Sequence, residues 1–478
     1  MAGSLQATPG FDLQPSSEQV ALSTNYITNF DFLNQYLPDT YEKEFERYGN
    51  RTVSGFLRMV GAEMPTNSDM IKWAEQGRLH TKYTSVTSAA AAGANTATWT
   101  IGGTDAPAAG AQAIRVGQTV FISDNTAASG LTNKAVVTAV SGDPADLTFD
   151  VAYYEAAGQA MAAATACTVM IYGSEFKKGT GGMVGSLEAD DVIFDNKPII
   201  LKDKYAVSGS DMAQIGWIEV TTENGATGYL WYLKSEHETR LRFDDYLETA
   251  MIEAVPAATG SGAEAALSSA SAAGTINAGS EGIFYAVENR GNVWSGGIPS
   301  TLADFDSIIG RLDKQGAIEE NVLFVNREMS FDIDDMLAAQ NSYGAGGTSY
   351  GLFDNDEQMA LNLGFTGFRR GYDFYKSDWK YLNDPTMRGD LSSGGINGML
   401  VPAGSTTVYD QVLGKNAKRP FLHVRYRASE TEDRRYKTWI TGSAGGAMNS
   451  DLDAMEVHFL SERAVCVMGA NNFFIFEG

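Results

Sequence analysis

The sequence is short of the residue types from which most metal and disulfide sites are built. Its 478 residues include only two cysteines, Cys167 and Cys466, and four histidines. Two cysteines cannot form the disulfide framework of a small secreted protein. His237 lies in the longest helical pattern but has no second histidine four residues away, so the paired imidazoles of a zinc protease are missing. We expect no metal site, and we expect assembly in the cytosol.

Basic side chains are also scarce. Thirty-five lysines and arginines stand against fifty-nine aspartates and glutamates, which gives a formal net charge of -24. A chain with this balance repels the phosphates that a nucleic-acid reader must neutralise. Sequence-specific DNA binding is therefore disfavoured.

No apolar run approaches the roughly 20 residues that span a bilayer. The amino terminus, MAGSLQATPG, lacks the basic start and apolar stretch of a secretory signal. We expect a protein that is neither embedded in a membrane nor exported.

The motifs of common catalytic sites are missing too. There is no GxxxxGK[ST] phosphate loop, and the candidate for a GxSxG elbow, Ser443, has Thr441 where the first glycine is required. The acidic groups FDIDD (331–335) and FDNDE (353–357) lack the spacing of a calcium loop. We expect no catalytic residue, cofactor or enzyme activity. A glycosidase that uses two carboxylates stays open as an alternative, because such a pair needs no fixed spacing.

What the sequence does contain is a clear change of character along its length. The chain is too long for one core of ordinary size, so two or three are expected. Residues 88–172 hold eight charged side chains among 85, with five strand-like runs parted by turn residues. This pattern predicts a small barrel or sandwich inserted into a surface loop. The runs are 95–101, 115–122, 135–140, 147–154 and 165–172.

The second half of the chain alternates helical and strand patterns. Residues 229–254 contain no Gly or Pro and predict one long helix. Residues 301–316, 321–326 and 330–340 predict a helix, a strand and a helix. The chain then ends in strands, which we expect to turn at Ser461-Glu462 between MEVHFL and AVCVMG.

One stretch is locally basic against the acidic whole. We interpret it as a surface that docks onto an acidic patch of a neighbouring copy. The alternative is a pair of solvated strand faces. The basic candidates are Lys415, Lys418, Arg419, Arg425, Arg427, Arg434, Arg435 and Lys437, and the acidic candidates are Asp332, Asp334, Asp335, Asp354, Asp356 and Glu357.

The order of these parts resembles the major capsid protein of tailed double-stranded DNA bacteriophages, which has the Hong Kong 97-type fold. The helix at 229–254 resembles the spine helix of that family's peripheral domain. The segment TLADFDSIIGRLDKQGAIEENVLFVNREMSFDIDDMLAA (301–339) resembles the helix, strand and helix of its axial domain. The ending 453–478 resembles the strands that return to the peripheral domain.

The resemblance implies an α+β fold of this type with an inserted small all-β domain. The implied parts are an N-terminal arm (1–50), an extended loop region (51–225) interrupted by the β insertion (88–172), a peripheral domain (226–300), an axial domain with surface loops (301–450) and the C-terminal strands (451–478).

The same resemblance implies a structural function. Copies of the chain would self-assemble as hexamers and pentamers into the icosahedral head shell of a virion, built in the host bacterial cytoplasm. The shell would enclose the genome without reading its sequence. The implied partners are a portal and a scaffold protein, with a decoration protein as a further candidate, and no membrane. The alternatives are an encapsulin-like compartment and a carbohydrate-binding or surface β-module protein.

Overall fold

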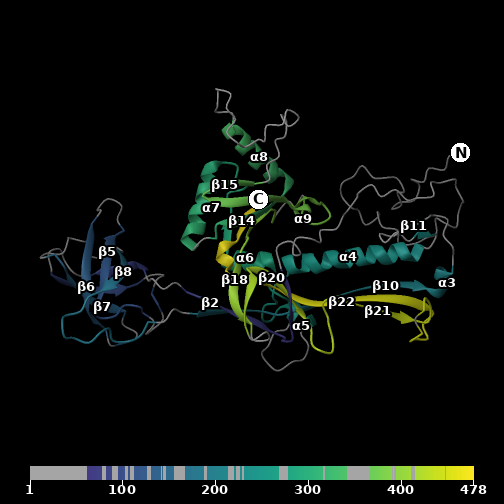
Figure 1. Ribbon diagram of the computed structural model, residues 1–478, viewed down its shortest axis with the longest axis horizontal. Helices are drawn as coiled ribbons and strands as arrows, with labels where there is room; N and C mark the ends of the chain where they lie inside the picture. The colour runs from purple at the N-terminus through teal and green to yellow at the C-terminus, as the bar shows by residue number, and fades with distance from the viewer. Residues whose placement is uncertain are drawn as a thin grey trace. The chain divides into compact units, whose positions relative to one another are not determined.

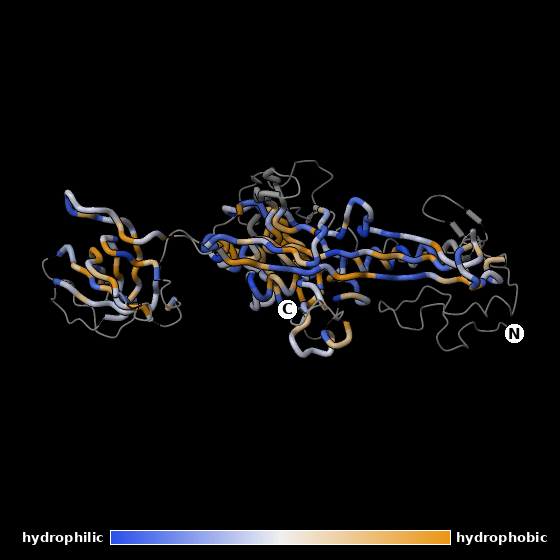
Figure 2. The backbone as a smooth tube through the Cα atoms, turned by 90° about the horizontal axis from the view of Figure 1, so that it is seen from below, coloured by the Kyte–Doolittle hydropathy of each residue, from blue (hydrophilic) through white to orange (hydrophobic). Residues whose placement is uncertain are grey.

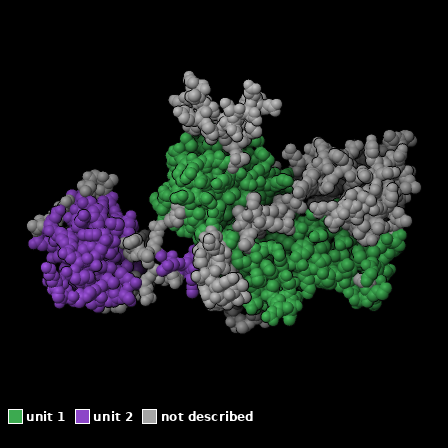
Figure 3. All heavy atoms as spheres, viewed as in Figure 1, with its two compact units in different colours: residues 1–72, 195–478 green, residues 73–194 purple. Residues whose placement is uncertain are grey.

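The computed structural model describes residues 62–478, apart from 78–81, 89–94, 103–105, 108–111, 126–130, 142, 144–146, 156–166, 188–190, 214–219, 222–226, 229–230, 268–277, 316–317, 342–366, 390, 392–393, 411–414 and 447. The described residues form a mixed α and β structure. The chain divides into two compact units, residues 1–72 with 195–478 (unit 1) and residues 73–194 (unit 2) (Figure 3). The expected arm, residues 1–50, lies outside the described residues.

Unit 2 is built around a closed barrel in the strand order β3-β4-β7-β6-β5-β8. Its strands are β3 (Lys82–Ser88), β4 (Thr96–Ile101), β5 (Gln118–Asp124), β6 (Thr132–Val140), β7 (Thr148–Tyr153) and β8 (Cys167–Ser174). Closure leaves no strand edge unpaired, which removes the usual risk of edge-to-edge aggregation.

The barrel closes because its strands alternate inward apolar and outward polar residues, with a period of two. In β4, for example, Ala97, Trp99 and Ile101 are buried and the residues between them are exposed. Hydrophobic stretches gather in the interior of this unit in Figure 2. Burial in this core, with a smaller effect from Asp124, raises the pKa of the Cys167 thiol to about 11.

All five strands expected for this region are present, with ends shifted by a few residues. The sixth, β3, was missed: it begins before the predicted start of the insertion at residue 88 and closes the barrel between β4 and β8. Strand β2 (Ile71–Gln76) precedes the barrel in the sequence and β9 (Asp191–Asn196) follows it. The two strands pair with each other, where the chain passes from unit 1 to unit 2 and back.

Unit 1 contains two larger sheets. The first is five-stranded, with the order β1-β20-β22-β10 and β21 also paired to β22. Its strands are β1 (Ala62–Thr66), β10 (Ile199–Ser208), β20 (Leu422–Arg427), β21 (Lys437–Gly442) and β22 (Ala454–Val467). The second is six-stranded, in the order β13-β23-β17-β14-β16-β15. Its strands are β13 (Asn292–Trp294), β14 (Glu320–Val325), β15 (Gly367–Arg370), β16 (Tyr372–Asp378), β17 (Ile396–Pro402) and β23 (Phe474–Glu477).

The remaining elements connect or cover these sheets. Two further strand pairs are β11 (Val220–Thr221) with β12 (Thr227–Gly228) and β18 (Ser405–Asp410) with β19 (Lys415–Pro420). The helices are α3 (Gly209–Met212), α4 (Trp231–Glu253), α5 (Gly262–Leu267), α6 (Ile283–Arg290), α7 (Leu302–Gln315), α8 (Arg327–Asn341), α9 (Lys380–Asn383) and the short 3-10 helix η4 (Ala470–Asn472). The expected long helix and the expected helix, strand and helix are confirmed as α4, α7, β14 and α8.

Helix α4 lies along the long strands β10 and β22 (Figure 1). Phe243 and Leu247 pack from the helix onto Met455, Val457 and Phe459, which alternate along β22 and so share one face. At the end of the helix, the Glu253 carboxylate accepts hydrogen bonds from Tyr381 Oη at 2.5 Å and Arg388 Nε at 2.6 Å. These hydrogen bonds join the end of α4 to α9 and to the residues that follow it.

Strand β23 is buried on both faces of the second sheet. Ile475 joins the core that contains α6 and the end of α4, whereas Phe474 and Phe476 join the core formed with α7 and α8. A strand with this pattern can only lie inside a sheet covered on both sides. The C-terminal strands therefore divide between two sheets, β22 in the first and β23 in the second, although the resemblance treated 451–478 as one set.

The turn expected at Ser461-Glu462 is wrong. Both residues lie in the middle of β22, a continuous strand of 14 residues, and both are buried. A polar pair usually ends an apolar strand, but here Arg434 and Arg435 provide hydrogen-bond and ion-pair partners for the two side chains inside the strand.

The structure predicts that unit 1 folds without the barrel, because the barrel core contains residues of unit 2 alone. We expect a chain that joins Gln76 to Asp191 through a short Gly/Ser linker to stay soluble and to keep the near-ultraviolet circular dichroism of Trp294, Trp379 and Trp439. The full chain is the control. Insolubility of the shortened chain, or loss of its cooperative unfolding, would contradict the prediction.

Candidate functional site: the charged cluster on β22

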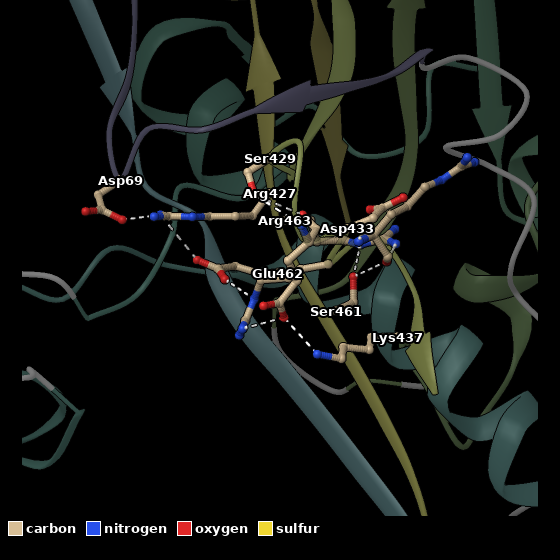
Figure 4. Close-up of polar contacts among 11 residues, drawn as sticks. Asp69, Arg427, Ser429, Asp433, Lys437, Ser461, Glu462 and Arg463 are labelled. Carbon is tan, nitrogen blue, oxygen red and sulfur yellow. Dashed lines mark hydrogen bonds and ion pairs between the residues drawn. The ribbon is translucent and has the colours of Figure 1, made fainter. Parts of the chain in front are cut away.

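Four of the eight basic residues that the sequence singled out meet at the middle of β22. We call this group the Glu462 cluster; it comprises Glu63, Asp69, Arg427, Glu432, Arg434, Arg435, Lys437, Ser461, Glu462 and Arg463. Its members come from β1 and the residues after it, from the end of β20, from the loop 428–436, from the start of β21 and from β22 (Figure 4).

Glu462 lies at the centre of the cluster. Its Oε2 is 2.6 Å from Arg434 Nε, and its Oε1 is 3.7 Å from Nη1 of Arg427. Arg427 also pairs with Asp69, and this hydrogen bond raises the pKa of its guanidinium. The backbone N–H of Glu462 donates to the Arg434 carbonyl oxygen at 3.0 Å. These contacts satisfy a buried carboxylate that would otherwise be costly.

Ser461 and Arg463 fasten the same strand from its other face. The Ser461 hydroxyl donates to the Arg435 carbonyl oxygen at 2.6 Å, and Arg463 Nη2 donates to the same oxygen at 3.0 Å. Arg463 Nε donates to Ser461 Oγ at 2.9 Å. Burial lowers the pKa of Arg463, and the nearby Glu63 carboxylate opposes that shift.

Glu63 connects the cluster to β1. It pairs with Arg435, and its Oε1 lies 3.5 Å from Arg463 Nη1. Strand β1 runs parallel to β20, from Ala62 opposite His423 to Thr66 opposite Arg427. The backbone pairing with β20 therefore holds all five residues of β1, and the ion pairs of Glu63 add to it.

The outer part of the cluster is more exposed. Lys437 Nζ lies 2.8 Å from Glu432 Oε1, and Arg434 Nη1 lies 3.5 Å from the same oxygen. The hydrogen bond from Lys437 is the main cause of the lowered pKa of Glu432. Both partners are nearly half exposed, so water and salt screen this pair and it contributes little to stability.

The cluster is close to neutral, because four carboxylates face five cations. The basic stretch thus has ion-pair partners within its own chain at Arg427, Arg434, Arg435 and Lys437, although the side chains of Arg435 and Lys437 stay 54% and 43% exposed. Their contact with a neighbouring copy stays a prediction. Lys415, Lys418 and Arg419 lie on β19, apart from the cluster in the chain, and Arg425 lies on β20.

The acidic candidates lie on another element. Asp332, Asp334 and Asp335 are on α8, where the Asp334 carboxylate is buried and lies 2.5 Å from Lys376 Nζ of β16. Asp334 is therefore engaged within the unit, while Asp335 is exposed and Asp332 is partly exposed. Asp354, Asp356 and Glu357 lie outside the described residues.

The sequence reasoning missed Glu63, Asp69, Ser461, Glu462 and Arg463. Glu63 and Asp69 lie far from the basic stretch in the chain, and only the parallel pairing of β1 with β20 brings them to it. The signal available in the sequence was the Ser-Glu-Arg triplet between two strand-like runs, MEVHFL and AVCVMG, because the triplet contains no Gly, Pro, Asn or Asp to form a turn.

The cluster contains no nucleophile paired with a general base. Its ion pairs and hydrogen bonds instead join β22 to β1 and to the loop 428–436. Within the described part of the chain, no three His, Cys, Asp or Glu side chains are grouped closely enough to hold a metal ion. No helix among the described residues is long and apolar enough to cross a membrane.

Comparisons by sequence give no relatives: no protein-family profile matches the chain, and no curated protein matches it. Comparison by structure finds phage structures. One from Microbacterium phage Oxtober96 is 9% identical with a TM-score of 0.39, over 93% of this chain and 97% of that one. The mature capsid of bacteriophage PhiM1 is 8% identical with a TM-score of 0.32, over 64% and 78%. The capsid of cyanophage P-SCSP1u is 8% identical with a TM-score of 0.34, over 64% and 80%. The identity and the TM-score are low for each of the three structures.

The geometry predicts that Glu462 stabilises unit 1 far more than Glu432 does. We expect Glu462→Gln to lower the free energy of unfolding by about 2 kcal/mol, because it leaves two partly buried guanidinium groups facing a neutral amide. The matched control Glu432→Gln removes the same charge from an exposed pair and should change the free energy of unfolding far less. Urea unfolding of the full-length variants measures both. Equal losses would refute the central role of Glu462.

Proposed function

We propose that this chain is a structural protein, the major capsid protein of a tailed bacteriophage, and that it self-assembles as hexamers and pentamers into the icosahedral head shell around the double-stranded DNA genome. The observation that carries the proposal is the arrangement of unit 1. One long helix, α4, lies along a sheet of long strands, and the chain continues from that sheet through η4 into a second sheet covered by α7 and α8. The family resemblance implies this order of parts.

On this proposal the parts of unit 1 take the family's roles. Helix α4 is the spine helix of the peripheral domain, together with β10, β21 and β22. The second sheet with α7 and α8 is the axial domain. The first 50 residues are the arm, and unit 2 is a barrel inserted into the extended loop. Charge supports the proposal, because a chain with a net charge of -24 does not adhere to the packed DNA.

The proposed location is the virion, after assembly in the host bacterial cytoplasm. The proposed partners are further copies of the chain, a portal and a scaffold protein, with a decoration protein as a further candidate. The docking contacts remain the basic and acidic residues found in the sequence. Because Asp334 is engaged by Lys376, we assign the contact to Asp332 and Asp335 on one copy and to Lys415, Lys418 and Arg419 of β19 on the other.

Assembly tests the proposal directly. We expect the purified full-length protein, expressed with and without a candidate scaffold protein, to form closed shells, tubes or capsomer rings in negative-stain electron microscopy, with matching masses by light scattering. A protein that stays monomeric under both conditions would overturn the proposal.

A charge swap tests the docking contact. We expect Lys418→Glu with Arg419→Glu to abolish assembly by placing like charges across the contact, and we expect Asp332→Lys with Asp335→Lys to restore it in the same chain. The matched control, Lys177→Glu with Lys178→Glu, changes the net charge equally on exposed residues of unit 2 and should assemble normally. Failure of the swap to restore assembly, with all variants folded, would place the contact elsewhere.

A further inference from the structure

Unit 2 has a hollow on the outer side of its barrel that no part of the proposed function uses. Its volume is about 790 Å³, which is within the range of small-molecule sites. The ends of β5, β6, β7 and β8 meet around it. It is lined by Thr119, Thr132, Asn133, Lys134, Tyr154, Glu155, Tyr172, Gly173, Ser174 and Glu175.

Two tyrosines present their rings at this hollow. Tyr154 and Tyr172 are 49% and 48% exposed, so both rings are accessible to a ligand. Tyr154 is held in place by a hydrogen bond from its hydroxyl to Glu175 Oε2 at 2.5 Å. Tyr172 lies at a bulge, because Thr119 pairs with Gly173 and Val120 with Ile171, which leaves Tyr172 as the extra residue. Bulges of this kind redirect a side chain near binding sites.

A third residue of the lining, Thr119, carries a buried hydroxyl. Thr119 is 5% exposed, and its Oγ1 has no hydrogen-bond partner among the described residues. Gly173, opposite it, has no side chain to cover it; a Cβ at that position would lie 3.1 Å from Thr119 Oγ1. A buried polar atom without a partner is costly, and a ligand hydroxyl would satisfy it.

The chemistry of the lining selects the ligand. Two carboxylates, Glu155 and Glu175, against one ammonium, Lys134, disfavour an anion. The hydroxyls and charged groups around the rim disfavour a purely apolar ligand, because they would be left without partners. A neutral sugar meets both conditions, since its C–H faces pack on tyrosine rings and its hydroxyls both donate and accept hydrogen bonds. We propose that the Tyr154–Tyr172 hollow of unit 2 binds a neutral saccharide.

The test uses the full-length protein and three neutral probes, maltotriose, cellotriose and triacetylchitotriose, followed by saturation-transfer difference NMR. We expect at least one probe to bind, and Tyr154→Ala and Tyr172→Ala each to weaken its binding by roughly tenfold or more. Tyr154→Phe keeps the ring and should retain most of the affinity. Tyr246→Ala removes a similarly exposed tyrosine from α4 and should change nothing.

Ser174→Arg provides a second route, should either alanine variant fail to fold. Ser174 is exposed at the rim, so the larger side chain fills the hollow without disturbing the core, and we expect binding to be lost. The proposal is overturned if none of the three probes binds the wild-type protein, or if binding survives in every folded hollow variant. It is also overturned if the diamine putrescine binds in a tyrosine-dependent way and no saccharide does. Shell assembly is measured separately, so these outcomes are independent of the proposed function.

Discussion

The whole of unit 1 depends on the pairing of β22 with three other strands and on its continuation into β23. Strand β22 pairs with β10 over ten residues, and it also pairs with β20 and β21. The chain then crosses through η4 and enters the second sheet between β13 and β17. The last segment of the sequence therefore completes both sheets. Neither can close until distant residues have met, such as Ile199 with Arg463 in the first sheet and Asn292 with Phe474 in the second. The contacts along β22 and β23 are therefore the main long-range constraint of the fold.

The Glu462 cluster explains how such a strand keeps its register. A purely apolar β22 would gain burial in several alignments, since a shift by two residues preserves the inward face. Ser461, Glu462 and Arg463 have these partners in a single alignment, because Glu63 lies on β1 and because Arg434 and Arg435 lie in the loop that joins β20 to β21. Ion pairs at partly buried sites add little net stability, and specifying one arrangement is a use consistent with their cost.

The sequence predicted elements wherever local pattern and burial agree. The long helix, the helix–strand–helix unit and five barrel strands follow from periodicity alone. It failed where a distant partner decides the outcome. Ser461-Glu462 looked like a turn because local rules place polar pairs outside strands, and only residues from β1 and the loop 428–436 make that pair stable inside one. Strand β3 was missed because its sequence, KYTSVTS, is largely polar, and it forms a strand through its pairing with β4 and β8 in the closed barrel. The charged residues were found in part, but two of their partners, Glu63 and Asp69, belong to a distant part of the chain.

The two units have separate hydrophobic cores. Unit 1 can therefore depend on many long-range strand pairings while the barrel of unit 2 contains local irregularities. The buried residues of the barrel pack among themselves, and those of unit 1 do the same. A bulge at Tyr172 or a glycine opposite Thr119 therefore weakens only the barrel, whose closed ladder tolerates it because no edge is exposed. Strand β22 has no such freedom, since a displaced residue there would disturb the pairing with β10, β20 and β21 and the packing of α4. The barrel strands show three such register shifts among the described residues, and the hollow lies at one of them, beside Tyr172.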